Sequence, residues 1–412
     1  MINNLTGKSQ VKLCPSCDWS VTLPPYKEGI KCSCPRCGAT LRSGRIYSLR
    51  QCAVISIAAL IFFVLSLFEP FLSLSTLGIN QEMRLISIFT VLHTDWLLLL
   101  YVCVLFTFLF PLFMLFTIIG TGLFNLKITP IIGEIYAFSH RFCMIDVFIL
   151  GVLVSLIKLT ALVDVEFHTG FILSGIFSVM MIWLYTKVRP QDIWDKVKTA
   201  KVDIIPGITG KNQHLSLCRH CSFVYDSRFY KKCPRCGHIK QIRNYDCYQK
   251  AAALLLSAII LYFPSNLYPI MFTSYLGNET GSNILEGVVT LWQMDSYFVA
   301  CVIFLASICI PVLKIIALII LMIIVKYRRP QRPKLLSKFY RIVAFIGKWS
   351  MIDVFVVIIM TSVVRFSGLM TIDPGFAIIT FCLVVIITMF AAEEFDERLI
   401  WDPINERRKE AR

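Results

Sequence analysis

Met144-Ile145-Asp146-Val147-Phe148 occurs a second time, unchanged, as Met351-Ile352-Asp353-Val354-Phe355. At the same offset, Ile193-Trp194-Asp195 returns as Ile400-Trp401-Asp402. Further pairs align at this offset or, where loops differ in length, at a slightly shorter one: Arg141 with Lys348, Lys158 with Arg365, Pro70 with Pro269, Pro111 with Pro311, and Cys34-Pro35-Arg36-Cys37-Gly38 with Cys233-Pro234-Arg235-Cys236-Gly237. Self-similarity of this kind marks a repeated structural unit. The sequence therefore predicts an internal duplication, with the two copies in parallel order.

Each copy contains long apolar runs. Hydrophobic residues make up 57% of the 412 residues and the mean hydropathy is +0.70, whereas soluble domains contain about 45–50% apolar residues. A helix needs ~20 such residues to cross a membrane. The predicted fold class is an all-α polytopic membrane protein with two tandem four-helix transmembrane bundles. We expect the helices at about 50–69, 95–123, 142–163 and 171–188, and at about 249–268, 296–326, 348–366 and 375–392.

The remaining segments define the predicted domain organisation. The longer connections, Phe71 to Thr94 and Ile270 to Asp295, are expected to be partly structured outside the bilayer. A short acidic or glycine-containing turn is expected between the third and fourth helices of each half. The predicted domains are a first zinc ribbon at 1–48, a transmembrane bundle at 49–190, a linker with a second zinc ribbon at 191–248, a second bundle at 249–395 and a cytoplasmic tail at 396–412.

Lysine and arginine predict the orientation, because short translocated loops are depleted in them. They are dense in 1–50, 187–250 and 326–348 and after Glu393. The segments around 70–95, 164–170, 269–295 and 367–374 contain Arg84 as their only lysine or arginine. Both termini and both cysteine-rich segments should therefore face the cytoplasm. No short apolar stretch with a cleavage site precedes the first helix, so we expect that helix to direct insertion. The net charge of +15 is spread between the apolar runs, which argues against a nucleic-acid partner.

Eight of the 16 cysteines form four Cys-x-x-Cys pairs, a metal-binding pattern. Four thiolates hold Zn²⁺ tetrahedrally without an open position, so each site is predicted to be structural. A rubredoxin-like iron site is the alternative, because a Cys₄ shell also suits iron. Modules this small cannot bury enough core to fold alone, and the metal would supply folding free energy. The predicted ligands are Cys14, Cys17, Cys34 and Cys37 in the first ribbon, and Cys218, Cys221, Cys233 and Cys236 in the second.

Two other residues that could bind a metal lie next to these ligands. Cys32 lies two residues before Cys34 and makes the ligand assignment there ambiguous. His220 lies between Cys218 and Cys221, and we expect it to be a surface residue rather than a ligand.

Charged residues also occur at matching places in the predicted third helices. Asp146 and Asp353 lie about one turn into these helices, and Lys158 and Arg365 lie near the opposite ends. A charge inside a membrane helix marks either a pathway or a pairing. The structural alternative for the two basic residues is extension of the side chain to the outer interface. For the aspartates it is a helix cap or an ion pair with Arg141 or Lys348. All four are candidates for a polar transport network.

Lys314 distinguishes the second half from the first. It lies well inside an apolar run, and the matching residue of the first half is Met114. A buried lysine loses its proton or finds a carboxylate, and Asp353 is the predicted partner, ahead of Glu69 and Asp146. The pair is open to two interpretations, a functional polar site or a purely structural contact. The repeated prolines Pro111 and Pro311 should kink the second helices near this level.

The paired ribbons, the tandem helical halves and the repeated Met-Ile-Asp-Val-Phe motif resemble the paraquat-inducible protein A family over nearly the whole chain. The resemblance implies tetraspanin-like bundles in a bacterial inner membrane and a subunit for phospholipid transport. It also implies a periplasmic MCE-domain partner, PqiB-like or LetB-like, that forms a tunnel for lipids between two membranes. A polar cluster in the second half, matched here by Lys314 and Asp353, is implied to be important. One chain does not separate the PqiA-like from the LetA-like branch.

Three function classes follow. The first is a transport subunit that loads or unloads phospholipid for the periplasmic partner and supports envelope integrity; no Walker-type phosphate loop is present, so ATP is not expected to drive it within this chain. The second is a scaffold that anchors the partner and recruits cytoplasmic factors through its ribbons. The third, a membrane redox enzyme using the thiols, is disfavoured. No nucleophile and base pair is evident, so we predict that the protein is not an enzyme.

Overall fold

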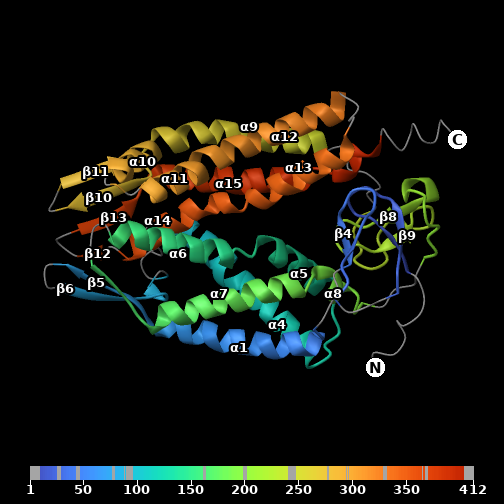
Figure 1. Cartoon of the computed structure of the whole chain (residues 1–412), viewed down its shortest axis with the longest axis horizontal. Helices are drawn as coiled ribbons and strands as arrows, with labels where there is room; N and C mark the ends of the chain where they lie inside the picture. Colours follow the sequence, from blue (N-terminus) through green and yellow to red (C-terminus); the bar gives the residue numbers. More distant parts are fainter. Residues whose placement is uncertain are drawn as a thin grey trace.

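The structure is a computed structural model, shown in Figure 1, and it is predominantly helical. Three parts follow one another along its longest axis: two cysteine-containing modules at one end, long helices in the middle, and small sheets at the other end. The residues that the structure describes are 10–25, 29–42, 47–76, 79–87, 89, 96–160, 164–197, 202–239, 247–275, 278–293, 295, 297–327, 332–363, 365–366 and 370–402.

Within these residues, eight helical segments are long and apolar enough to cross a membrane. They agree in number with the eight predicted helices. In the first half they are formed by α1 (Leu49–Phe68); α3 (Leu97–Cys103), η1 (Val104–Leu109) and α4 (Phe110–Gly122); α5 (Pro130–Phe142) and α6 (Ile145–Thr160); and α7 (Thr169–Lys187). In the second half they are α9 (Cys247–Leu267); α11 (Tyr297–Phe304), η3 (Leu305–Cys309) and α12 (Ile310–Tyr327); α13 (Pro333–Ile346), η4 (Trp349–Met351) and α14 (Ile352–Val363); and α15 (Phe376–Glu394).

The third segment of each half begins earlier than the sequence predicts. We expected these helices to begin at about 142 and 348, the second after a basic loop, but α5 and α13 occupy the preceding stretches. Both helices start with a proline at the first position, where the missing N–H costs nothing, and Thr129 caps α5 by accepting from the N–H of Ile132 at 3.4 Å. Their charged faces disguise them, because an amphipathic helix resembles a loop when only uninterrupted apolar runs are counted. The aspartates of the repeated motif therefore lie inside the segment, beside its break.

The predicted kinks at Pro111 and Pro311 take the form of wider, π-helical turns. These turns, η1 and η3, end immediately before Phe110 and Ile310. A proline has no N–H for the usual i→i−4 bond, and the residue before each proline instead donates to the carbonyl five residues earlier. One freed carbonyl, that of Phe106, accepts from the N–H of Met144 at the break between α5 and α6, at 3.4 Å. The irregular turns of neighbouring segments thus complete one another's hydrogen bonds.

Two antiparallel sheets cover the end opposite the modules, which corrects the all-α expectation. In one, the strand order is β6-β5-β7, from Ile79–Arg84, Pro70–Thr76 and Asp164–Phe167; in the other it is β11-β10-β13-β12, from Asn278–Ser282, Met271–Tyr275, Met370–Pro374 and Arg365–Phe366. The longer connections are partly structured, as predicted, and also include α10 (Ile284–Gln293). In place of the expected short turns before the fourth helices, the chain forms strands. The sequence did not predict them, because pairings such as Leu72 with Phe167 join segments far apart in the chain and leave little local signal.

Helices of each half pack mainly on helices of the same half. In the first half α1 packs against α4 and α7, and in the second α9 packs against α15. The start of the last helix of each half also lies against the chain that follows the first helix of that half. An ideal Cβ on Gly170 would lie 2.6 Å from the carbonyl oxygen of Pro70, and one on Gly375 would clash with the carbonyl oxygen of Pro269. Since no side chain fits there, these glycines are a further repeated feature, which the sequence alone does not explain.

Candidate functional site

The first cysteine module (residues 10–42) brings its four predicted ligands together. Two short hairpins, β1 (Gln10–Leu13) with β2 (Ser20–Leu23) and β3 (Cys32–Ser33) with β4 (Thr40–Arg42), each carry one Cys-x-x-Cys turn. The Sγ atoms of Cys14 and Cys37 are 3.5 Å apart and those of Cys17 and Cys34 are 3.7 Å apart. Cys32 is not part of this cluster. The four sulfurs that converge are therefore those of the two Cys-x-x-Cys pairs.

The second cysteine module (residues 202–239) repeats this arrangement around β8 (Leu215–Leu217) and β9 (Val224–Asp226). Its Sγ–Sγ distances are 3.5 Å for Cys218 and Cys236 and 3.6 Å for Cys221 and Cys233. The N–H of Gly237 donates to the carbonyl of Cys233 at 2.8 Å, as that of Gly38 does to Cys34. Both glycines have φ above +70°, the left-handed conformation that the turn requires. The Gly of Cys-Pro-Arg-Cys-Gly is thus explained by backbone geometry.

Both clusters fit a tetrahedral metal ion. Tetrahedral Zn²⁺ with Zn–S bonds of ~2.3 Å places neighbouring sulfurs about 3.8 Å apart, and all four sulfurs of each cluster lie within 4.8 Å of one another. All sixteen cysteines are free thiols. A sulfur-only, closed shell suits zinc or iron in a structural role.

Each module docks on a tryptophan of the repeated Ile-Trp-Asp motif, and the pairing is crossed. The guanidinium of Arg36, in the first module, lies between the rings of Trp19 and Trp401, at 4.8 and 4.7 Å from their centroids. Trp401 belongs to the second half and follows η5 (Glu397–Ile400). Arg341 of α13 donates to the carbonyl of Cys37 at 2.7 Å. The first module therefore packs against the second half of the protein, through Trp401 and Arg341.

The second module docks on the first half through the equivalent residues. Arg235 lies over the rings of Phe223 and Trp194, at 5.6 and 5.9 Å, and its guanidinium donates to the carbonyl of Trp194, the last residue of α8 (Pro190–Trp194). Arginine stacks well on aromatic faces and keeps its charge. The arginine of Cys-Pro-Arg-Cys and the tryptophan of Ile-Trp-Asp are thus two sides of one contact, made twice.

A buried ion pair supports the docking segment of the second half. Arg398 donates from Nε to Oδ1 of Asp396 at 3.0 Å and from Nη2 to Oδ2 at 2.9 Å, and both side chains are 3% exposed. Burial alone would raise the pKa of Asp396, but the bonds from Arg398 outweigh it and lower that pKa below its usual value. The beginning of the predicted tail is therefore part of the folded core, while residues from 403 onward lie outside the described part.

We expect Arg398→Ala to destabilise the protein by about 3–5 kcal/mol at neutral pH, because it leaves a buried carboxylate without its cation. Arg228→Ala is the matched control: Arg228 pairs with Asp226 at the same spacing, at 2.7 Å, but its side chain is 61% exposed. An exposed pair of this kind contributes little to stability, because water screens its charges. Thermal unfolding of the two purified variants measures the difference. Because the pKa of Asp396 is lowered, the ion pair stabilises the protein above the unfolded pKa of ~3.9 and the effect disappears as the pH falls through the folded value.

The buried lysine predicted to mark the second half is present. Lys314 lies near the start of α12, is 3% exposed, and donates from Nζ to Oγ1 of Thr388 on α15 at 3.2 Å. Among the described residues, no carboxylate forms an ion pair with Lys314, so the structure does not bring it to Asp353 as predicted. An ideal Cβ on Gly347 would lie 2.7 Å from Nζ, which places the amine against the break between α13 and α14.

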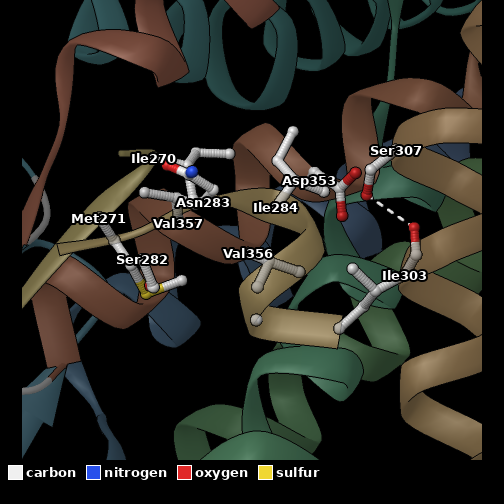
Figure 2. Close-up of a pocket in the computed structure, with 11 residues that line it drawn as sticks. Ile270, Met271, Ser282, Asn283, Ile284, Ile303, Ser307, Asp353, Val356 and Val357 are labelled. Atoms are coloured by element: carbon white, nitrogen blue, oxygen red, sulfur yellow. Dashed lines mark hydrogen bonds between the residues drawn. The ribbon is translucent and has the colours of Figure 1, made fainter. Parts of the chain in front are cut away.

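Asp353 lies in a small cleft on the sheet side of this break. The cleft is lined from several elements, including Asn283 before α10, Ser307 of η3 and Val357 of α14. In Figure 2 the carboxylate of Asp353 lies toward Ser307, whose hydroxyl donates to the carbonyl of Ile303 at 2.6 Å. Asp353 is 6% exposed. A carboxylate, a π-helical turn and a helix break thus meet in one place, within an otherwise apolar segment.

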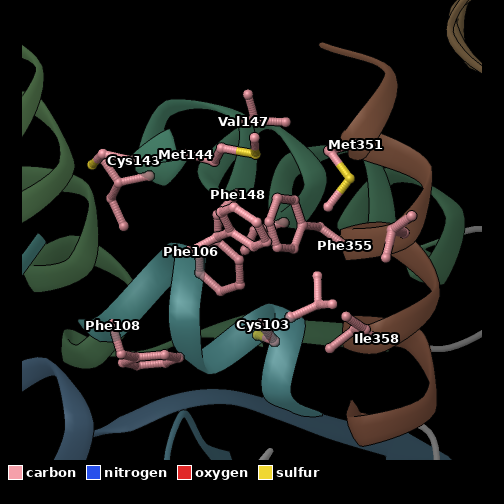
Figure 3. Close-up of a cluster of buried hydrophobic side chains, with 14 of the residues drawn as sticks. Cys103, Phe106, Phe108, Cys143, Met144, Val147, Phe148, Met351, Phe355 and Ile358 are labelled. Carbon is pink, nitrogen blue, oxygen red and sulfur yellow. The ribbon is translucent and has the colours of Figure 1, made fainter. Parts of the chain in front are cut away.

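The two copies of the repeated pentapeptide contact each other. Phe148 of α6 and Phe355 of α14 pack edge to face, with centroids 5.6 Å apart and an interplanar angle of 86°, and Figure 3 shows them in the shared apolar cluster. An ideal Cβ on Gly151 would lie 2.9 Å from Cβ of Phe355, so the helices approach closely here. The motif therefore joins the halves, a role that its repetition did not reveal.

In the first half the matching positions are less polar. Met114 is fully buried at the position of Lys314, and Asp146 is half-buried. The expected partners of the aspartates make other contacts: Arg141 pairs with Glu393 at 3.6 Å, and Lys348 donates to the Tyr185 hydroxyl at 3.1 Å.

The two remaining candidates lie at the sheet end. Lys158 lies in the last turn of α6, and Arg365 lies in strand β12 rather than in a helix as predicted. Their side chains are outside the described part of the structure. Their extension to the interface therefore stays a prediction.

Comparison with known proteins gives matches along nearly the whole chain. The family model described as paraquat-inducible protein A matches residues 49–198 and 248–405. The chain is 36% identical over 397 residues to "Intermembrane transport protein PqiA" of Escherichia coli strain K12, with 95% of each chain covered. It is 26% identical over 402 residues to "Lipophilic envelope-spanning tunnel protein A" of the same strain, covering 94% of this chain and 90% of the relative.

A third relative is the "Probable intermembrane transport protein" of Haemophilus influenzae, which is 27% identical over 404 residues, with 94% of this chain and 95% of the relative covered. No solved structure matches the chain.

Proposed function

Because this multi-pass membrane protein belongs to the paraquat-inducible protein A family, we propose that it is the inner-membrane subunit of an intermembrane phospholipid transport system. In this proposal it loads or unloads lipid for a periplasmic MCE-domain tunnel, PqiB-like or LetB-like, and so supports envelope integrity. The names of the relatives, which refer to intermembrane transport and to an envelope-spanning tunnel, support a transport rather than a catalytic role. The higher identity to PqiA favours that branch.

The single observation that carries the proposal is the buried polar site at the broken helices of the second half. Lys314 and Asp353 are almost fully buried at the break between α13 and α14. Ionisable groups inside a membrane are costly and usually mark a functional pathway, and broken helices lie at the substrate sites of many transporters. We infer that Lys314 and Asp353 change their protonation or hydrogen bonding as α12, α14 and α15 rearrange during lipid transfer.

The proposal assigns the remaining parts as follows. The four-helix halves are tandem, tetraspanin-like bundles with the predicted domain boundaries, except that the second bundle extends to Asp402, and both termini are cytoplasmic. Each cysteine module is a zinc ribbon whose four thiolates hold a structural Zn²⁺, and the supporting observation is the tetrahedral spacing of the sulfurs. The sheets at the opposite end are then periplasmic, where an MCE-domain partner docks.

Site-specific photocrosslinking in living cells tests this assignment. A photoreactive amino acid replaces Glu279, an exposed residue of β11, and in a control it replaces Lys326, an exposed residue at the module end of α12. We expect Glu279, but not Lys326, to crosslink to a periplasmic MCE-domain protein, and mass spectrometry of the purified complex should find bound phospholipid. Crosslinks to such a protein from Lys326 alone would contradict the orientation, and a complex without phospholipid would contradict the transport role.

The alternative is a scaffold that anchors the partner and recruits cytoplasmic factors through the ribbons. Its supporting observation is that much of the modules' surface is exposed, including Phe229 and Ile239. Phe229→Ser with Ile239→Ser separates the two functions. If lipid transfer persists in this double variant, recruitment through that surface is not essential; if transfer stops while the partner stays bound, recruitment is the main function.

A further inference from the structure

A third group of metal-ligating side chains lies where the second module meets α5. It consists of Glu134 from α5 and of His220 and His238 from the module. Nδ1 of His238 is 2.8 Å from Oε1 of Glu134, and Nδ1 of His220 is 3.6 Å from the same oxygen. The ligand atoms of all three residues lie within 4.8 Å of one another. Two imidazoles from one element thus converge on one carboxylate from another.

The cysteine cluster itself positions both imidazoles. His220 lies between Cys218 and Cys221, and His238 directly follows Gly237 at the end of the other knuckle. The N–H of Cys233 donates to the carbonyl of His238 at 2.8 Å, which fixes the backbone there. The two rings stack with their centroids 3.6 Å apart. The pair is therefore presented on a rigid frame, with the nitrogen of each ring turned to the carboxylate.

We propose that Glu134, His220 and His238 form a third metal site, which takes an exchangeable divalent transition ion such as Zn²⁺. Ligands bound to Zn²⁺ at ~2.0–2.2 Å in a tetrahedron lie about 3.4 Å apart, between the two measured distances. Imidazole with carboxylate suits Zn²⁺, Cu²⁺, Ni²⁺ and Fe²⁺. Three protein ligands leave a position for water, and the side chains are 37–43% exposed. Unlike the buried cysteine clusters, this site is open to ions from solution.

An ion at this site clips the second module to the first half of the protein. The same module also contacts the second half: Arg219 donates from Nη2 to the carbonyls of Phe395 and Glu393, at 3.3 and 3.4 Å. The module therefore bridges the two halves, and the third site adds to the contact that Arg235 makes with Trp194 of the first half. Ion binding strengthens that attachment and restrains movement of one half relative to the other.

The experiment uses the full-length protein in detergent, with its tightly held metal retained, and Co²⁺ as the probe. We expect one further Co²⁺ per chain, with weak visible absorption and without the sulfur-to-cobalt charge-transfer band of a thiolate site. Glu134→Gln and His238→Ala should each weaken this binding by more than ~100-fold, beyond the ~10–100-fold that loss of a supporting partner costs. The control is His214→Asn, which changes an exposed histidine of the same module and keeps a residue that tolerates its positive φ of 56°.

Three outcomes overturn the inference. Wild-type protein that binds no ion beyond its tightly held ones shows that the triad is a hydrogen-bonded contact only. Binding that survives in Glu134→Gln and His238→Ala places the ion elsewhere. Hydrogen exchange tests the clip separately: Co²⁺ should slow exchange in residues 130–142 of the wild type and the control but not of Glu134→Gln, and unchanged exchange in the loaded wild type overturns the clip.

Discussion

A protein with Cys17→Ser and Cys34→Ser is expected to lose one tightly held metal ion per chain and, with it, the folded first module. Two of four ligands are removed, and a structural Zn²⁺ in a small module supplies an apparent ~10–16 kcal/mol of folding free energy. The module has no other source of comparable size, because its hairpins are only two to four residues long per strand. Metal analysis of dialysed protein gives the stoichiometry.

The loss should spread to the far end of the chain. Arg36 and the carbonyl of Cys37 contact Trp401 and Arg341, so unfolding of the module exposes the segment around η5 to protease. Cys32→Ser is the control, because Cys32 lies outside the four-sulfur cluster; it should keep the metal and the protease resistance. If the double variant holds as much metal as the wild type, the cluster is not the metal site.

The second large effect is expected from Lys314→Met, which gives the second half the methionine that the first half has at the matching position, Met114. We expect phospholipid transfer to fall at least about tenfold, equivalent to ~1.4 kcal/mol on the limiting step, with normal protein levels. The melting temperature should stay the same or rise, because the change removes a buried amine whose partner, among the residues that the structure describes, is the Thr388 hydroxyl. Transfer in reconstituted vesicles and thermal unfolding of the same preparation measure the two quantities.

Stability separates the functional from the structural interpretation of Lys314. A purely structural lysine predicts a lower melting temperature together with any loss of transfer, since Thr388 would lose its donor. Lys326→Ala is the matched control: it removes a lysine from the exposed end of the same helix and should change neither quantity. Normal transfer by Lys314→Met at normal protein level would refute the proposed role of the buried polar site.

Much of this architecture follows from the sequence because it is encoded locally. Apolar runs of membrane-spanning length predict the eight helical segments, and the Cys-x-x-Cys spacing predicts two four-sulfur clusters. The repeated Met-Ile-Asp-Val-Phe predicts two copies, and Lys314 is recognisable by its position in an apolar run. In each case, neighbours in sequence are sufficient to define the feature.

What the sequence did not predict depends on residues far apart. The outer sheets need β5 to pair with β7 and β10 with β13, and α13 is hidden by its charged face. The partner of Lys314 is Thr388. The sequence did not predict it, because nothing distinguishes this hydroxyl of α15 from those of the many other serines and threonines. The triad of Glu134, His220 and His238 joins two parts of the chain that no spacing rule connects, although His220 is exposed, as predicted.

The crossed docking of the modules has a consequence for synthesis. Arg341 and Cys37, which meet in the folded protein, are 304 residues apart, and a ribosome adding ~5–20 residues per second needs roughly 15–60 s to make that stretch. The first module leaves the ribosome with its own tetrahedral sulfur cluster but without the tryptophan on which it rests. The hydroxyl of Ser20 can meet the carbonyls of Ile205 and Ile208 as soon as the second module is made. The first module reaches Trp401 only when nearly all of the polypeptide has been made and inserted, so this contact marks a chain whose last helix is in place.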